Sequence, residues 1–281
     1  MAVRDRELGI GQIFMDTFSI FFRHIHIFVL LGFVPLVILN LLLGSLLIGS
    51  MSSLLMAIGS FQLLMVAGIA MPVIILFTAN FIAAGFVVHA AYDAKLGKPL
   101  RLGHYVAKSF RQIIPLTVSA LIIAIFSAAS FFFLILIAAA LFGIGTALDT
   151  SSIAAWIVIF LCLIPSIWIA TVLAVIVPSM VIDQVGFGGV WRSDELTLGY
   201  RWQILVLLVL LHLCLVVITA LLQGVVETMF FIVDPVANAL LQGFVSAVSA
   251  GVPFVGIALI YIRLRELKDG KTLEQLAEAS M

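Results

Sequence analysis

The chain has 281 residues, of which 64% are hydrophobic and only 10% are charged. Because a typical soluble domain is about 45–50% apolar and about 25% charged, this composition excludes a water-soluble protein and indicates one whose solvent is lipid. The formal net charge is zero, so we expect no nucleic acid among the partners. No polar stretch is long enough for a separate soluble domain, and residues 1–281 are expected to form a single polytopic membrane domain.

Three long apolar blocks follow one another along the chain, at 25–91, 113–182 and 204–262. One membrane-spanning helix needs about 20 residues, so each block is long enough for two helices joined by a short polar turn. We place six transmembrane helices near 25–48, 68–92, 113–141, 153–182, 203–223 and 238–265. The predicted fold class is therefore an all-α integral membrane protein.

The basic residues predict the orientation of these helices. All 14 Lys and Arg residues lie before the first span, between the second and third, between the fourth and fifth, or in and after the last turn of the sixth. The positive-inside rule puts these segments and both termini in the cytoplasm. We expect the protein in the bacterial inner membrane.

An internal repeat accompanies the hydropathy pattern. An aromatic residue followed by an arginine opens each block, and the arginines are Arg23, Arg111 and Arg201. An acidic residue closes each block, at Asp93, Asp183 and Glu266, and a glycine follows each acid, at Gly97, Gly186 and Gly270. We predict three parallel repeats of a cytoplasmic amphipathic helix and a helical hairpin, over about 8–98, 99–186 and 187–270, with a short cytoplasmic tail at 271–281.

The cytoplasmic segments are themselves amphipathic. In the first, apolar Ile10, Phe14 and Phe21 recur at helical spacing against polar Gln12 and Asp16. In the segment 186–203 we expect the helix to begin at Ser193, as its N-cap. Such helices lie in the headgroup plane with their aromatic side chains turned towards the lipid.

The block-opening arginines and block-closing acids have two interpretations. Pairs of one arginine and one acid would tie the interfacial helices to the membrane bundle. Alternatively the arginines would bind lipid phosphates, because the guanidinium group matches phosphate geometry. The residue pattern leaves both open.

Three polar residues lie near the middle of predicted spans: Asn40, Asn80 and His212. A polar side chain in lipid usually finds a hydrogen-bonding partner on a neighbouring helix. The other interpretation is a solute site, since ionisable groups inside a membrane often have a function. A solute site requires the three side chains to converge on one water-filled cavity.

Small residues recur every fourth position in the last span, at Gly243, Ala247 and Gly251. Such a stripe lets another helix approach closely. The neighbour is either a helix of the same chain or a second molecule, in a homo-oligomer or a complex with another membrane protein.

The chain shows no catalytic motif. Cys162 and Cys214 are isolated within apolar runs, so we expect no disulfide, metal site or cofactor. An enzyme acting on lipid headgroups would need His89, Asp93 and His104 within mutual reach.

Two stretches resemble a known family. One comprises residues 177–183 (VPSMVID), Trp191-Arg192-Ser193 and residues 196–202 (LTLGYRW), and the other comprises residues 258–273 (ALIYIRLRELKDGKTL). Together they are similar to the bacterial membrane domains found in front of some glycerophosphodiester phosphodiesterases and to the related YciC-like membrane proteins. The resemblance implies the six-span fold. It implies no phosphodiesterase chemistry, because we expect no room for that soluble domain.

The preferred hypothesis from these observations is a non-enzymatic inner-membrane protein whose partners are membrane lipids. It would act as an accessory or scaffold subunit or as an organiser of envelope lipids. The alternative is a transporter or channel for a small or lipid-like solute, lined by the three intramembrane polar residues.

Overall fold

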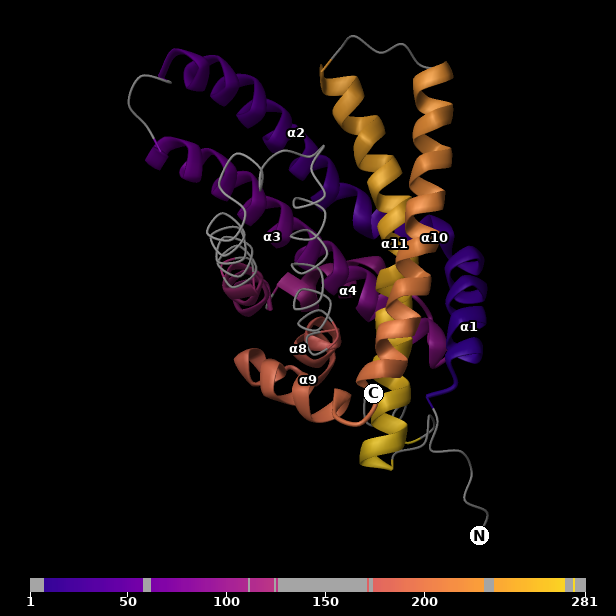
Figure 1. The fold of residues 1–281 in the computed structure, drawn as a ribbon. Coiled ribbons are helices and arrows are strands. Elements are labelled where there is room, and N and C mark those ends of the chain that lie inside the picture. The colour runs from indigo at the N-terminus through magenta and orange to yellow at the C-terminus, as the bar shows by residue number, and fades with distance from the viewer. Residues whose placement is uncertain are drawn as a thin grey trace, which may run out of the picture.

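The computed structural model describes residues 8–57, 62–110, 112–123, 125, 171, 174–229, 235–270 and 275. Within these residues the protein is all-helical and has no strand (Figure 1). The helices are α1 (Ile10–Arg23), α2 (Ile25–Ala57), α3 (Gln62–Lys95), α4 (Leu102–Phe110), α8 (Ile176–Asp183), α9 (Gly189–Thr197), α10 (Arg201–Met229) and α11 (Pro235–Asp269), with a 3₁₀ turn η1 (Gly186–Gly188). A short apolar helix, Ile113–Ile123, follows α4.

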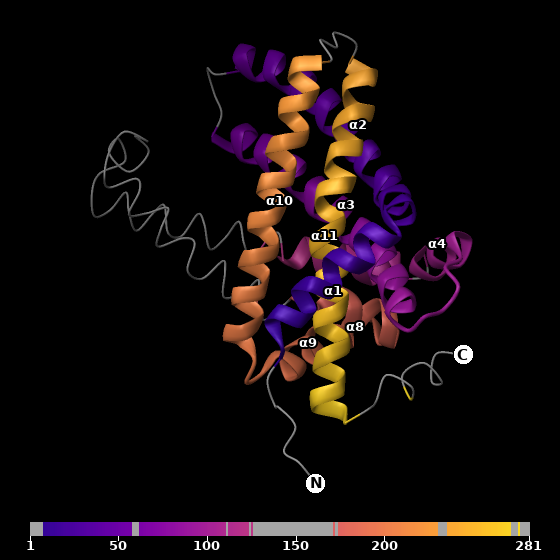
Figure 2. The ribbon, with the colours of Figure 1, turned by 90° about the vertical axis from the view of Figure 1, so that its right-hand side faces the viewer.

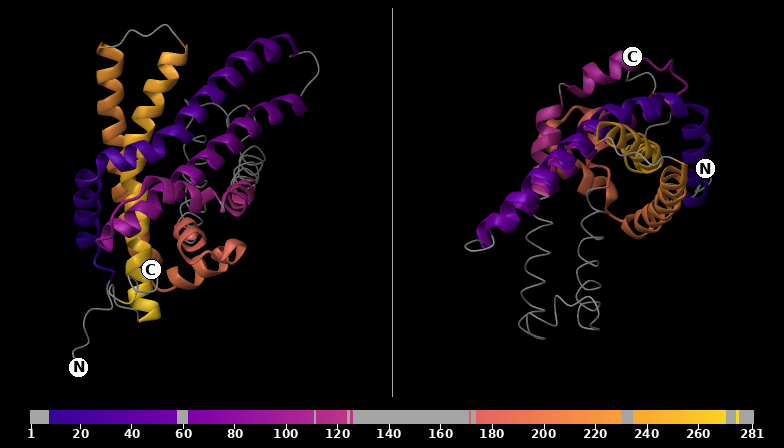
Figure 3. Two further views of the ribbon diagram at one scale, coloured as in Figure 1. Left: turned by 180° about the vertical axis from the view of Figure 1, so that it is seen from behind. Right: turned by 90° about the horizontal axis from the view of Figure 1, so that it is seen from above.

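Two long helical hairpins form the body of the protein. α10 and α11 run antiparallel, and the α2–α3 hairpin leans away from them (Figure 1, Figure 3). α11 is central, because it packs against α1, α2, α3 and α10. The short helices α1, α8 and α9 lie around the C-terminal half of α11 (Figure 2). We call one region of the protein the charged end. It comprises the C-terminal turns of α3, α8 and α11, together with the short helices α1, α4 and α9.

Two described helices are long and apolar enough to cross a membrane, over Arg201–Val226 and Val236–Asp269. α1 and the first part of α2, over Ile25–Leu41, would form a third if this bent pair is counted as one span. Parts of the spans predicted at 113–141 and 153–182 lie outside the described residues. The fold is thus that of a helical membrane protein, and the predicted number of six spans stays a prediction.

A sharp bend separates α1 from α2. The two helices meet at an angle of 84°. The backbone N–H of His24 still bonds to the carbonyls of Ile20 and Phe21, and α2 begins at the next residue. The sequence explains the bend, because α1 has a polar face that needs water whereas α2 is apolar on all sides once past His26. α1 buries Ile13, Thr17 and Phe21 and leaves Met15 and Phe22 exposed.

The span predicted at 153–182 is interrupted near its end. A turn at Ala174 and Val175 precedes α8, which begins at Ile176. Pro178 has no backbone N–H, so the carbonyl of Ala174 cannot receive the helical hydrogen bond from this position. Pro178 is therefore the residue that accounts for the break before α8.

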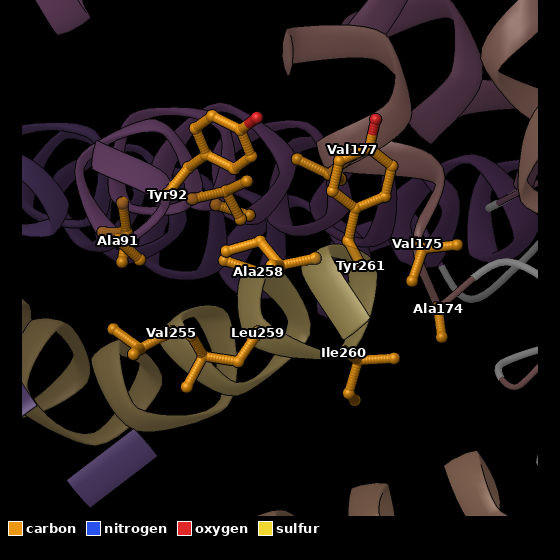
Figure 4. Packing of buried hydrophobic residues seen from close by; sticks show 14 of the residues in the cluster. Ala91, Tyr92, Ala174, Val175, Val177, Val255, Ala258, Leu259, Ile260 and Tyr261 are labelled. Carbon is orange, nitrogen blue, oxygen red and sulfur yellow. The ribbon is translucent and has the colours of Figure 1, made fainter. Parts of the chain in front are cut away.

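The main apolar core joins α3, α8 and α11. Figure 4 shows Tyr92 of α3 and Tyr261 of α11 with their hydroxyl groups pointing in the same direction. Both tyrosines are buried, as are Ala91 and Ala258, whose small side chains let α3 approach α11. Val177 extends this core onto α8.

The small-residue stripe of α11 faces helices of the same chain. A Cβ atom added at Gly243 would lie 2.9 Å from the Cα atom of Val37 in α2, and Ala247 packs against Gly32 one turn further along. A Cβ atom at Gly251 would overlap the ring of Phe21 in α1. The stripe therefore lets α2 and α1 contact the α11 backbone.

The start of α9 was predicted too late. The helix begins at Gly189, four residues before the expected N-cap Ser193, which is buried in the helix. Gly189 sits close to α8, because the hydroxyl of Ser179 donates a 2.9 Å hydrogen bond to its carbonyl and a Cβ atom there would overlap Met180. This tertiary contact outweighs the local capping preference of Ser193.

Gly243→Ala is expected to lower the free energy of unfolding by about 1–3 kcal/mol, because the new methyl group has to displace the α2 backbone. The measurement is the thermal unfolding midpoint of the purified protein in mild detergent. Gly224→Ala in α10 is the matched control, since no atom lies within 4 Å of its added Cβ. Equal midpoints for the two variants, with only the oligomeric state altered by Gly243→Ala, would contradict the packing described here.

Candidate functional site

A chain of ion pairs ties α8 and α9 to the last turns of α11. Arg265 of α11 lies 3.0 Å from the carboxylate of Asp183 at the end of α8. Arg192 of α9 lies 2.6 Å from the carboxylate of Asp269, which is itself 3.5 Å from Arg265. Acid and base therefore alternate across three helices, in the order Asp183, Arg265, Asp269, Arg192.

These charges are largely shielded from solvent. Arg265 is 12% exposed, Asp183 15% and Asp269 17%. Burial lowers the pKa of the Arg192 guanidinium, but its hydrogen bonds to Asp269 and Glu195 outweigh burial, and the pKa is raised. Removing one partner of such a pair leaves a buried charge uncompensated, which is strongly destabilising. The pairs therefore fix the positions of α8 and α9.

Two further ion pairs surround a small polar pocket between α1, α3 and α11. Lys95 lies 2.6 Å from Asp16, and Arg263 lies 2.9 Å from Glu266. These four residues and Gln12 contribute to the lining of a cavity of about 210 Å³. Its two acids and two bases balance, so the pocket favours neither anions nor cations.

The predicted block-opening arginines lie in different settings. Arg201 contacts Asp194 of α9. Arg23 is exposed in the last turn of α1, whereas Arg111 lies outside the described residues. The acids that close the second and third blocks pair with arginines of α11, as given above. Arginine–acid pairs that join two helices are therefore present at the charged end, and Arg192 and Arg265 form the buried ones.

Titratable side chains surround Tyr105, where α4 meets α3. The ring of the buried Tyr105 lies 6.1 Å from the ring of His89 in α3 and 6.1 Å from that of His104. Burial raises the pKa of Tyr105 to about 12, and the nearby carboxylate of Asp93 adds to the rise. The phenol therefore stays protonated at neutral pH and acts in packing. Within the described residues no group of three His, Cys, Asp or Glu could hold a metal ion.

Asn40, Asn80 and His212 lie near the middle of predicted spans, but they do not meet in the polar pocket or in the apolar groove described next. The side-chain amide of Asn40 donates a 2.8 Å hydrogen bond to the carbonyl of Leu36 in its own helix. Nδ1 of His212 lies 2.8 Å from the carbonyl of Leu208, and the ring is exposed on α10. Asn80 is half-buried in α3. None of the three lines the polar pocket or the groove described next.

An apolar groove lies between α2, α3 and α4. Its volume is about 670 Å³. Its lining comes from positions 30 to 39 of α2, positions 75 to 86 of α3, Leu102 and Val106 of α4, and Ile113. Among the described residues that line it, Thr78 is the only one with a polar side chain. The groove therefore suits a hydrocarbon ligand.

The segment that closes this groove is strongly basic. Residues 95–111 contain no acid and five of the 14 Lys and Arg residues, namely Lys95, Lys98, Arg101, Lys108 and Arg111. Arg101 is exposed and directly precedes Leu102, which lines the groove. Apolar lining and positive charge thus meet at α4.

Sequence reasoning missed the groove and the Arg192–Asp269 pair. The last span was predicted to end near residue 265, which left Asp269 beyond the helix, but α11 continues to Asp269. The spacing of Arg265 and Asp269 by four residues was the available signal, because such pairs share a helix face. No local sequence pattern predicts the groove, because it depends on the relative placement of α2, α3 and α4.

Comparison of the chain with protein-family models, with curated proteins and with solved structures found no match. Membership of the family that the two stretches resemble therefore stays a prediction. No relative's activity or ligand bears on the charged end or on the groove.

Asp183→Asn is expected to destabilise the protein by about 3 kcal/mol, because it removes the nearer of the two buried carboxylates that balance the guanidinium of Arg265. Glu195→Gln is the matched control, since Glu195 is 71% exposed and its pair with Arg192 is worth less than about 1 kcal/mol. Unfolding midpoints in mild detergent test both. Equal effects of the two variants would show that the ion-pair chain does not hold α8 and α11 together.

Proposed function

We propose that the protein is a non-enzymatic bacterial inner-membrane protein that organises envelope lipids at the cytoplasmic face. The observation that carries the proposal is the charged end, where short amphipathic helices are attached to the bundle at the level of the headgroups. α1 turns by 84° from α2, and α9 is tied to α11 by Arg192 and Asp269. These attachments hold the amphipathic helices in a set position against the membrane surface.

Large apolar side chains on these short segments support a lipid partner. Trp191 of α9 is 80% exposed, Trp202 at the start of α10 is 71% exposed, and Phe22 of α1 is 60% exposed. Tryptophan is enriched at the membrane–water interface, where its amphipathic ring is most stable. A face of this kind fits the headgroup region of a bilayer, as for other interfacial helices.

The same proposal includes six spans in three repeats, with the charged end in the cytoplasm. The glycine after each predicted repeat supports it, because Gly97, Gly186 and Gly270 have φ angles of 69°, 56° and 66°. This left-handed conformation is favoured by glycine and ends helices. Gly97 and Gly270 follow the ends of α3 and α11, whereas α8 ends at the left-handed Gln184, with a φ angle of 56°, and Gly186 opens the 3₁₀ turn after it. A left-handed residue just after each of the three helices is the pattern expected of a repeated unit.

The proposal predicts that anionic lipids gather around the protein. We expect spin-labelled phosphatidylglycerol to be motionally restricted several-fold more than spin-labelled phosphatidylcholine in vesicles that contain the protein, since each basic residue near the surface attracts anionic lipid by about 1 kcal/mol. Electron spin resonance measures both restricted fractions. Raising the salt concentration is expected to reduce the difference.

Vesicles that contain a single-span peptide at the same lipid ratio are the control. No preference for phosphatidylglycerol over phosphatidylcholine, or selective flux of a solute through the purified protein, would contradict the proposed function.

A further inference from the structure

We propose that the groove between α2, α3 and α4 binds one acyl chain of an anionic phospholipid, with the phosphate beside Arg101 at the start of α4. This inference rests on the proposed function and names the lipid class and the site.

The length of the groove matches one leaflet of a bilayer. Its lining extends from Ile75 to Phe86 along α3, which corresponds to about 16 Å at 1.5 Å per helical residue. The hydrocarbon layer of one leaflet is about 15 Å deep, half of the bilayer core. The cavity of about 670 Å³ lies within the range of ordinary ligand pockets. An acyl chain that enters at the headgroup level would therefore end near the far end of the groove.

The α2 wall of the groove is open to the surrounding bilayer. Leu30, Val34 and Ile38 line the groove and are each more than half exposed. They recur every fourth residue and so form a single stripe along α2. An acyl chain can therefore enter sideways from the membrane, without passing through water.

The α4 end of the groove is held in place. Leu102 and Val106 of α4 line it, while Tyr105 of the same helix is buried beside His89 of α3. Asp93, near the end of α3, lies close enough to raise the pKa of the Tyr105 phenol. This attachment distinguishes the groove from a chance crevice between lipid-facing helices, because the buried Tyr105 packs α4 against α3 next to the groove-lining Leu102 and Val106.

The charge around the groove selects an anionic headgroup. Lys95 is paired with Asp16, but residues 96–110 have three further basic residues and no acid, whereas residues 184–203 around α9 balance Arg192 and Arg201 with Asp194 and Glu195. Arg101 is exposed immediately before the α4 wall of the groove. A phosphate bound beside Arg101 would therefore lie near net positive charge, whereas the segment around α9 has no net charge.

The test is photolabelling of the full-length protein in vesicles. The probe is phosphatidylglycerol with a diazirine near the middle of one acyl chain, and phosphatidylcholine with the same chain is compared with it. Mass spectrometry of peptides after illumination locates the adducts. We expect them to concentrate at positions 30–39 and 75–86, with more labelling from phosphatidylglycerol than from phosphatidylcholine.

Two pairs of variants sharpen the test. Ala79→Trp fills the groove and is expected to reduce labelling there to the level of exposed α10 positions, whereas Val217→Trp, at a half-exposed α10 position, leaves it unchanged. Arg101→Gln is expected to lower the ratio of phosphatidylglycerol to phosphatidylcholine labelling by about fivefold, the factor equivalent to about 1 kcal/mol per basic residue. Arg23→Gln, at an exposed arginine of α1, is its control and leaves the ratio unchanged.

Each outcome decides the proposal. An even spread of adducts over the groove and the exposed face of α10 would overturn the proposed site. The positions labelled in the wild-type protein are enough for this decision, so it does not depend on whether Ala79→Trp folds. Equal labelling by the two lipids would overturn the anionic headgroup. Anionic lipid enrichment in the spin-label experiment together with an unlabelled groove would retain the proposed function and reject only this inference.

Discussion

The ion-pair chain at the end of α11 is the interaction on which the arrangement of the short helices depends. In a membrane, helices are not driven together by the hydrophobic effect, because lipid is as apolar as their side chains. α8 and α9 have 8 and 9 residues, lengths at which an isolated helix is marginal in water. Buried pairs such as Arg265 with Asp183 and Arg192 with Asp269 give these helices defined positions that apolar contact alone would not specify.

α11 combines two kinds of contact along its length. Towards its N-terminus, Gly243 and Gly251 let α2 and α1 touch its backbone, so dispersion contacts hold these helices. In its last turns, Arg265 and Asp269 supply the polar contacts to α8 and α9. The change from small to charged residues follows the change in surroundings, from the apolar interior to the headgroup level.

Local sequence patterns predicted the parts of the fold that depend on local physics. Hydropathy located α2, α3, α10 and α11, and helical periodicity located α1 as an amphipathic segment. The start of α9 was wrong because Ser179 of α8 fixes Gly189 by a contact across the fold. Local patterns could not predict the ion-pair partners of the charged residues or the groove for the same reason. Both depend on the relative placement of helices that are distant in sequence.

α4 joins the two features that favour a lipid partner. One of its faces supplies Leu102 and Val106 to the apolar groove, and another buries Tyr105 against α3. Because the segment around α4 also carries the largest share of the basic residues, a phospholipid bound there would be recognised by its chain and its phosphate through a single element. A helix held by a buried tyrosine keeps its groove-lining residues in a constant position, and a groove with a fixed wall can retain one lipid among the many that exchange around the protein.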